Sequence, residues 1–242
     1  QITLLEDYDL PLMERASQRM LENMHNQLTF QACHDDLTQL INRKEFERAV
    51  EVSIAQAKAG KDIQHGLLYL DLDQFKVVND TCGHKAGDEL LRQLAAILQQ
   101  DVRSSDVLAR LGGDEFGLLL TGCQLEDALQ IADKLRRLVE DYRFVWEGKS
   151  FAIGVSIGLV PIGGEVDSIA KALSAADTAC YAAKESGRDN YVFFTAEMNS
   201  SNQQRLEMER SLRSALEQNE YLLQFQPIVD INKGTMMGVE AL

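Results

Sequence analysis

Several residue types that mark particular protein classes are scarce in this sequence. Only 3 of the 242 residues are proline, which argues against long proline-rich linkers. The four cysteines are far apart and form no C-x-x-C pair, so we expect free thiols in a reducing compartment, with no disulfide framework and no zinc site. The sequence holds no signal-peptide pattern and no run of about 18 apolar residues, so we expect no direct membrane contact from this chain.

Positive charge is also scarce. The chain has 24 Lys and Arg residues against 38 Asp and Glu residues, a formal net charge of −14. Binding to nucleic acid or to an anionic membrane requires clustered cations that neutralise phosphates. We therefore expect neither partner, and a small polyanionic ligand would need a few local cations or a metal ion.

The rest of the composition, 45% hydrophobic and 26% charged, is that of a globular protein. At roughly 100–200 residues per domain, the length allows one large domain, or one domain with fragments. Because the chain starts at Gln1 rather than at Met, we expect an anchor or a sensor to precede it in the whole protein.

Apolar residues recur with helical spacing in some segments and gather in short strand-like runs in others. The Gly112-Gly113 pair predicts a hairpin between two of these runs. Strands that alternate with helices predict an α+β sandwich, a central sheet covered by helices. The helices are expected over 10–32, 43–57, 87–100, 125–140 and 169–185, and the strands over 66–70, 107–110, 116–120 and 151–159.

Both ends of the chain are predicted to be separate from this sandwich. Residues 1–32 form a linker whose helix is either packed on its own domain or part of a short parallel coiled coil that joins two protomers. Residues 33–196 form the main domain. Residues 197–242 combine a polar helix with strand-like runs that have no obvious partners, which predicts the start of a second domain.

Two carboxylates are expected to meet at one edge of the sheet. Asp71 follows a buried strand, and Asp114 lies at the tip of the Gly-Gly hairpin. Such a pair suits Mg²⁺, which uses one or two carboxylates together with substrate phosphates. Paired glycines allow a phosphate to approach the backbone closely. From spacing alone, an exposed hairpin tip and an acidic strand end remain the alternative.

The order of motifs resembles the GGDEF family, the diguanylate cyclases. Gly112-Gly113-Asp114-Glu115-Phe116 is similar to the family signature, and the resemblance covers roughly residues 32–194. Gln39 stands where the family usually has Gly, a departure that concerns the local turn. The other matching blocks are Asp35-Asp36-Leu37-Thr38 with Asn42-Arg43, the segment 71–76 with Asn79-Asp80, Gly83-His84 with Gly87-Asp88, and Ala176-Asp177, Tyr181, Lys184 and Gly187-Arg188.

The resemblance implies a fold similar to class III nucleotidyl cyclases and polymerase palm domains. It also implies that each domain of a homodimer binds one GTP, and that two facing domains form cyclic di-GMP and release two pyrophosphates. The implied roles are Asp71, Asp114 and the Leu72 carbonyl for Mg²⁺ or Mn²⁺; Asn79, Asp88 and His84 for guanine; Phe75, Gly112, Gly113, Lys184 and Arg188 for phosphates; and Lys76 and Glu115, beside Asp71 and Asp114, for catalysis.

Each role has a structural alternative. Asn79 suits a turn, and Asp88 suits a helix N-cap. Lys184 and Arg188 suit a helix C-terminus, where the dipole favours cations, and they share one face if the helix continues that far. His84 is as well explained as a polar turn residue.

Arg103-Ser104-Ser105-Asp106 resembles the family's R-x-x-D inhibitory site, where the product docks on arginine and aspartate. Arginine can bind phosphate through a fork of hydrogen bonds and stack on guanine. A surface salt pair is the alternative. Arg136 or Arg137 is a candidate for a further contact with the product.

The segments 223–229 and 240–242 resemble the opening of EAL domains, the cyclic di-GMP phosphodiesterases, with Glu240 at that family's metal-binding glutamate. A stub of roughly 40 residues cannot build a barrel of roughly 250, so no phosphodiesterase activity is expected in this chain. The leading hypothesis is a cytoplasmic bacterial cyclase domain whose parent protein is tethered to a membrane or free. The alternatives are a silent regulatory module that binds GTP or cyclic di-GMP, and a dimerisation device.

Overall fold

The computed structural model describes residues 10–60, 63–163, 166, 168–195, 225–230, 233 and 235–241. The chain divides into two compact units, Gln1–Thr195 and Ala196–Leu242. All four cysteines are free thiols. Within the described ranges, no helix is both long enough and apolar enough to cross a bilayer.

The first unit contains one six-stranded sheet in the order β1-β3-β4-β2-β7-β8. The central pairs are antiparallel, whereas each edge strand is parallel to its neighbour. The strands are β1 (Ile41–Asn42), β2 (His65–Asp73), β3 (Val107–Gly112), β4 (Glu115–Leu120), β7 (Gly154–Ile162) and β8 (Tyr191–Phe193), with a separate hairpin of β5 (Arg143–Trp146) and β6 (Lys149–Ala152).

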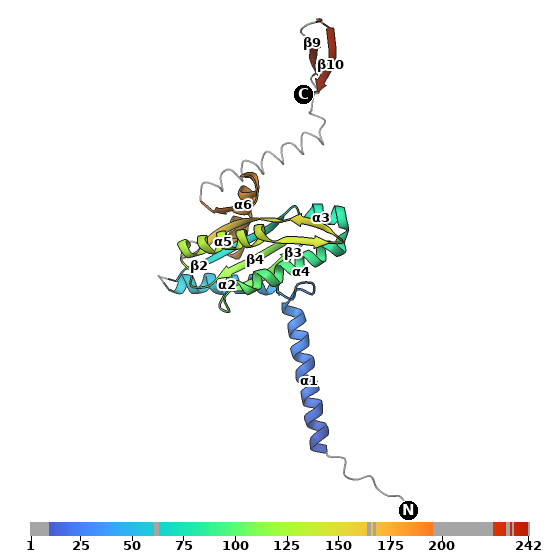
Figure 1. Cartoon of the computed structure of the whole chain (residues 1–242). Coiled ribbons are helices and arrows are strands. Elements are labelled where there is room, and N and C mark those ends of the chain that lie inside the picture. Colours follow the sequence, from blue (N-terminus) through green and yellow to red (C-terminus); the bar gives the residue numbers. More distant parts are fainter. Residues whose placement is uncertain are drawn as a thin grey trace, which may run out of the picture. The chain divides into compact units, whose positions relative to one another are not determined.

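Helices cover both faces of this sheet (Figure 1). Leucines of α4 and apolar residues of α5 pack on one face, and those of α2 and α6 pack on the other. Each fully buried leucine of this core contributes about 1.5–3 kcal/mol. The helices are α1 (Leu10–Cys33), α2 (Arg43–Ala59), α3 (Phe75–Cys82), α4 (His84–Gln100), α5 (Leu125–Asp141) and α6 (Ile169–Glu185).

Glycine sets how closely α6 approaches the sheet. A Cβ at Gly158 of β7 would lie 2.0 Å from the carbonyl oxygen of Ala176 and 2.4 Å from the nitrogen of Cys180. These are backbone atoms of α6 and cannot move aside easily. The helix therefore lies directly on β7, which fixes the position of its C-terminal end beside the end of β2.

The α+β sandwich predicted from the sequence is present, with local differences, among them the unexpected short strands β1, β5 and β8. The expected strand over 151–159 is divided at Ile153 between β6 and β7. The helix expected from Gly87 begins at His84, and α3 precedes it.

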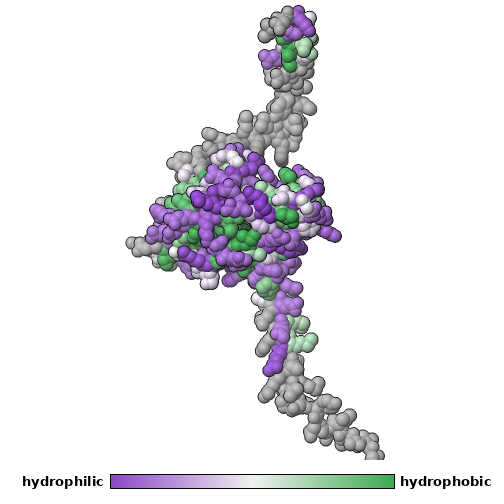
Figure 2. All heavy atoms as spheres, in the orientation of Figure 1, coloured by the Kyte–Doolittle hydropathy of each residue, from purple (hydrophilic) through white to green (hydrophobic). Residues whose placement is uncertain are grey.

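On the face drawn in Figure 2, hydrophilic side chains predominate over the compact domain, as expected for an acidic globular surface.

The second unit is described only at its end, as an antiparallel pair of β9 (Phe225–Asp230) and β10 (Thr235–Ala241). A bulge between Met236 and Gly238 shifts its register. The polar helix expected over 196–218 lies outside the described residues.

Candidate active site

Three acidic residues meet at one end of the sheet because of strand register. Asp71 of β2 lies opposite Glu115 of β4, and the amide of Leu72 donates to the carbonyl of Asp114 at 3.2 Å. Asp114 belongs to the turn between β3 and β4, in which Gly113 has a φ of +51°. The sequence predicted that Asp71 and Asp114 converge, and the antiparallel pairing of β2 with β4 is the reason they do.

Lys184, in the last turn of α6, is the positive partner of this acidic group. Its Nζ lies 2.6 Å from Oδ2 of Asp71. Burial raises the pKa of Asp71, the nearby Asp114 and Glu115 raise it further, and Lys184 acts in the opposite direction. Burial lowers the pKa of Lys184, but its hydrogen bond and charge interaction with Asp71 outweigh this, so the Lys184 pKa is raised. The ion pair shows that the acidic group attracts a cation.

The donor set fits a hard divalent ion. Asp71 and Asp114 offer carboxylate oxygens, and the backbone carbonyl of Leu72, which the sequence analysis named with them, is also an oxygen donor. Within the described residues, no group of three or more His, Cys, Asp or Glu side chains is arranged to hold a metal by itself. A site of this kind suits Mg²⁺, which typically takes one or two protein carboxylates and completes its coordination with water and substrate phosphates.

Arg110, which the sequence analysis did not single out, holds the Gly-Gly turn in place. Its Nε and Nη2 donate to the carbonyl of Gly113 at 3.1 and 2.9 Å, and its Nη1 donates to both carboxylate oxygens of Asp35 at 3.1 Å. Asp35 lies two residues after α1 and also accepts from the amide of Thr38. The only sequence signal was an arginine two residues before the Gly-Gly pair.

The predicted guanine residues lie on two neighbouring helices. Asn79 is in the second turn of α3 and Asp88 is the fifth residue of α4, so neither is the turn residue or the N-cap of the alternative interpretation. The Oδ1 atom of Asn79 is buried and has no hydrogen-bond partner, and a Cβ on Gly87 would lie 2.1 Å from it. A buried acceptor without a donor fits a site completed by a ligand. His84, at the start of α4, is exposed.

The remaining predicted phosphate and catalytic residues surround this end of the sheet. Phe75 begins α3 and packs toward Gly87, and Lys76 beside it is exposed. The shared face of Lys184 and Arg188 was expected only if the helix continued to Arg188, and α6 ends at Glu185, so that condition is not met. Arg188 instead lies in the following loop with a φ of +65°.

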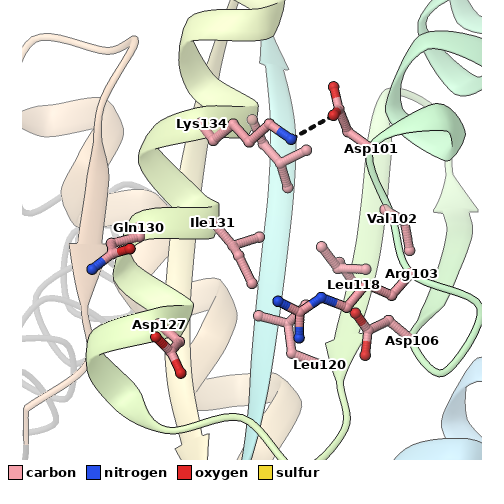
Figure 3. Close-up of a pocket in the computed structure, with 11 residues that line it drawn as sticks. Asp101, Val102, Arg103, Asp106, Leu118, Leu120, Asp127, Gln130, Ile131 and Lys134 are labelled. Carbon is pink, nitrogen blue, oxygen red and sulfur yellow. Dashed lines mark hydrogen bonds and ion pairs between the residues drawn. The ribbon is translucent and has the colours of Figure 1, made fainter.

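A second feature, a cavity of about 330 Å³, lies where the far part of β4 faces α5. Figure 3 shows Arg103 and Asp106 together in this cavity, with the ion pair of Lys134 and Asp101 above them. Asp106 also accepts from the amide of Thr121 at 3.0 Å. The lining residues are Asp101, Val102, Arg103, Asp106, Leu118, Leu120, Asp127, Gln130, Ile131, Lys134 and Leu135.

The arginines suggested as further contacts do not line this cavity. Arg136 is turned away into ion pairs with Asp133, Glu140 and Asp189, and Arg137 pairs with Asp133. Lys134 is the cation of α5 that does line it. The sequence analysis named only Arg136 and Arg137, and the orientation of α5 directs Lys134 into the cavity instead.

Comparison with known proteins places these features in a family. Residues 32–190 match the family described as "Diguanylate cyclase, GGDEF domain". The chain is 44% identical over 185 residues to "Probable diguanylate cyclase DgcE" of Escherichia coli, and 39% identical over 223 residues to "Bifunctional diguanylate cyclase/cyclic di-GMP phosphodiesterase MucR" of Pseudomonas aeruginosa. These alignments cover 76% and 92% of this chain, but only 17% and 32% of the two relatives.

The fold is also similar to solved structures. The coiled coil and GGDEF domain of DgcB from Caulobacter crescentus, solved in complex with c-di-GMP, aligns with a TM-score of 0.70 and 28% identity. That alignment covers 75% of this chain and 96% of the other. The family match, the sequence relatives and the shared fold agree that this chain belongs to the GGDEF family of diguanylate cyclase domains.

Proposed function

We propose that this chain condenses two molecules of GTP into cyclic di-GMP and releases two pyrophosphates. The observation that carries the proposal is the meeting of Asp71, Asp114 and Lys184 beside a glycine turn, at one end of the sheet. The buried, unpaired acceptor of Asn79 follows Asp71 closely in the sequence. This combination provides oxygen donors for a metal, cations for phosphates and a polar group for a base.

Asp71, Asp114 and the Leu72 carbonyl would hold Mg²⁺ or Mn²⁺. When bound, such an ion polarises a phosphate and lowers the pKa of an attacking hydroxyl. Lys184 then exchanges its contact with Asp71 for the terminal phosphates of the substrate, where Arg188 joins it. The absence of side chains at Gly112 and Gly113 lets the phosphates lie against the backbone of the turn.

Other residues supply orientation and proton transfer. Asn79 and Asp88 bind the guanine edge, and a base without the matching donors leaves them unpaired, which is a strong basis for rejecting adenine. His84 and Phe75 lie beside this part of the site. Glu115, which accepts a hydrogen bond from the buried phenol of Tyr69, is placed to take the proton of the attacking hydroxyl. The exposed Lys76 stabilises negative charge that develops at the phosphate.

One domain provides only half of the catalytic arrangement, so we propose a homodimer. The apolar side chains Met20, Leu21, Met24 and Leu28 of α1 are more than half exposed, with the three- and four-residue spacing of a coiled-coil seam. A second copy of α1 is the partner that such a seam fits. This favours the coiled-coil alternative over a helix packed on its own domain.

We further propose that the product inhibits the enzyme at the cavity of Arg103 and Asp106. Arg103 offers a guanidinium to phosphate or to a guanine face. Lys134 adds a second cation from α5, in place of Arg136 or Arg137. The cavity is separate from the acidic end of the sheet, so product can occupy it while the active site holds GTP.

We also propose that residues 197–242 are a linker and the start of an EAL domain, in keeping with the bifunctional relative whose alignment covers 92% of this chain. The proposal assigns no phosphodiesterase activity to this chain. The second candidate function is a regulatory module that binds GTP or cyclic di-GMP without catalysis. The cavity around Arg103 is the observation behind this candidate, because a ligand could bind there without any catalysis.

The test is to incubate the purified chain with GTP and Mg²⁺ and to identify the products by mass spectrometry. Asp114→Asn removes a proposed metal ligand, and Asp141→Asn, at the exposed end of α5, is the matched control. We expect cyclic di-GMP from the parent and from Asp141→Asn, and none from Asp114→Asn or after chelation of the metal. Nucleotide binding without any product from the parent would support the regulatory module instead.

A further inference from the structure

The loop that follows α6 has an unusual backbone. Three consecutive residues have positive φ angles: Gly187 (+114°), Arg188 (+65°) and Asp189 (+42°). Glycine adopts such angles freely, but for other residues the left-handed region is unfavourable. Arg188 and Asp189 therefore keep this conformation only because surrounding contacts hold them.

The first contact comes from the end of β2. Asp73 is only 5% exposed, and its Oδ2 accepts from the backbone amide of Asp189 at 2.9 Å. The hydroxyl of Ser156, on the adjacent strand β7, donates to the same carboxylate at 2.9 and 3.1 Å. A buried carboxylate needs donors of this kind. Asp73 and Ser156 thus join the loop to two central strands.

The second contact comes from α5. Nη1 of Arg136 lies 3.0 Å from Oδ2 of Asp189. The Arg136 side chain is only 17% exposed and also pairs with Glu140 and Asp133. Asp189 is therefore held from two sides, through its amide by the sheet and through its carboxylate by a helix.

The side chain of Arg188 is exposed, although its backbone is held by the contacts of the loop. It is 62% exposed, and its Nε lies 3.9 Å from Oδ1 of Asp73, which is too far for a hydrogen bond. Lys184, by contrast, is in direct contact with Asp71. The backbone of Arg188 is fixed while its guanidinium points into solvent near the acidic end of the sheet.

We propose that Asp73, Ser156, Asp189 and Arg136, here called the loop brace, are positioning residues that present Arg188 to the terminal phosphates of bound GTP. This inference rests on the proposed function, which assigns Arg188 to those phosphates. The brace touches neither substrate nor metal. Its effect is to fix a cation in advance, so that binding a triphosphate does not require the loop to become ordered.

Nucleotide binding can distinguish a positioning role of the loop brace from a general role in folding stability. Arg188 reaches only the outer phosphates, so loss of the brace weakens binding of a guanosine triphosphate and leaves binding of GMP nearly unchanged. An ordinary loss of folding stability would affect both nucleotides. The selectivity for the triphosphate is therefore the quantity to measure.

The experiment measures binding of 3′-deoxy-GTP, which lacks the attacking hydroxyl, and of GMP, by calorimetry with Mg²⁺ present. Asp189→Asn keeps a residue that tolerates positive φ but removes the charge, and Arg136→Met removes its partner on α5. Arg137→Met, one position along the same helix and paired only with Asp133 among the contacts given above, is the matched control. Arg188→Ala is the reference for complete loss of the guanidinium.

We expect each brace variant to bind 3′-deoxy-GTP about tenfold more weakly and GMP within about twofold of the parent. In an Arg188→Ala background, the brace substitutions should cause no further loss, because the group they position is gone. Arg137→Met should bind both nucleotides as the parent does. Thermal melting of each variant records whether it folds, and the two brace variants test the same link from opposite ends.

Two results would overturn the brace while leaving the proposed function intact. One is weaker binding in Arg188→Ala with parent-like binding in both brace variants. The other is an equal loss of triphosphate and GMP binding in the brace variants, which indicates a general structural role. If Arg188→Ala itself binds 3′-deoxy-GTP like the parent, then the assignment of Arg188 to phosphate fails, and the brace proposal fails with it.

Discussion

Arg110 joins Asp35, at the end of the α1 region, to the carbonyl of Gly113 in the turn beside the acidic residues. All five N–H donors of an arginine guanidinium lie in one plane, so a single side chain can hold two groups in fixed relation. Here one edge holds a carboxylate and the other holds the turn. The turn that carries Asp114 is thereby tied to the segment that follows α1.

This contact predicts the effect of replacing Arg110. Arg110→Lys keeps the charge but cannot hold both groups, so the position of Asp114 is less well fixed. We expect cyclic di-GMP synthesis to fall by about tenfold to a hundredfold. Initial rates measured by chromatography, with dimer content measured by sedimentation, test this.

Arg92→Lys is the control, because Arg92 makes an exposed ion pair with Glu89 on α4, away from the turn. It should retain the parent rate. Parent-like synthesis by Arg110→Lys would show that the turn keeps its geometry without this contact.

The proposed product inhibition predicts the behaviour of Arg103→Ala. Removing the guanidinium from the cavity should weaken product binding by about tenfold or more, since charge-assisted hydrogen bonds to phosphate are lost. The amount of cyclic di-GMP at which synthesis stops should rise accordingly. Lys134→Met should have a smaller effect in the same direction, and Arg137→Met none. Inhibition curves with added product measure all three, and an unchanged curve for Arg103→Ala would reject the site.

The exposed apolar side chains of α1 predict a dependence on protein concentration. Replacing Leu21 and Leu28 by serine should weaken the dimer, because the apolar surface that a second copy would bury is removed. Activity per protomer should then fall on dilution at a much higher concentration than in the parent. Matching dilution curves for variant and parent would show that α1 does not set the dimer population.

His65 predicts how stability changes with pH. The residue is 3% exposed, its Nδ1 accepts from the amide of Gly122 at 3.2 Å, and burial lowers its pKa. A lowered pKa means that the unfolded chain binds a proton more readily than the folded chain. The stability is therefore complete above the ordinary histidine pKa of about 6.5 and declines as the pH falls below it, by at most about 1.4 kcal/mol per pH unit.

Urea denaturation at several pH values between about 5.5 and 7.5 measures this decline. His65→Asn keeps an acceptor for Gly122 but cannot be protonated, so the part of the slope that belongs to His65 should disappear. His84→Asn, which replaces an exposed histidine at the start of α4, is the matched control substitution. A slope unaffected by His65→Asn would assign the pH dependence to other groups.

The sequence by itself determined the fold class, the family and most of the regular elements. The expected helix over 169–185 has the bounds of α6, and those over 43–57 and 125–140 differ from α2 and α5 by one or two residues. Local periodicity suffices for long amphipathic helices because one face of each must be buried. The sequence placed Asp71 at a strand end and Asp114 at a hairpin tip, but they converge only because β2 pairs with β4.

Only the tertiary structure decided the remaining features of the fold and the site. These features depend on contacts between residues far apart in the chain. The β5–β6 hairpin was missed because its strands have few buried residues and give little alternation. The ends of β2 and α6 meet only because Gly158 lets the helix lie on the sheet. Arg188 lies beyond the end of α6, and the next residue, Asp189, contacts Asp73 and Arg136, partners that no local pattern reports.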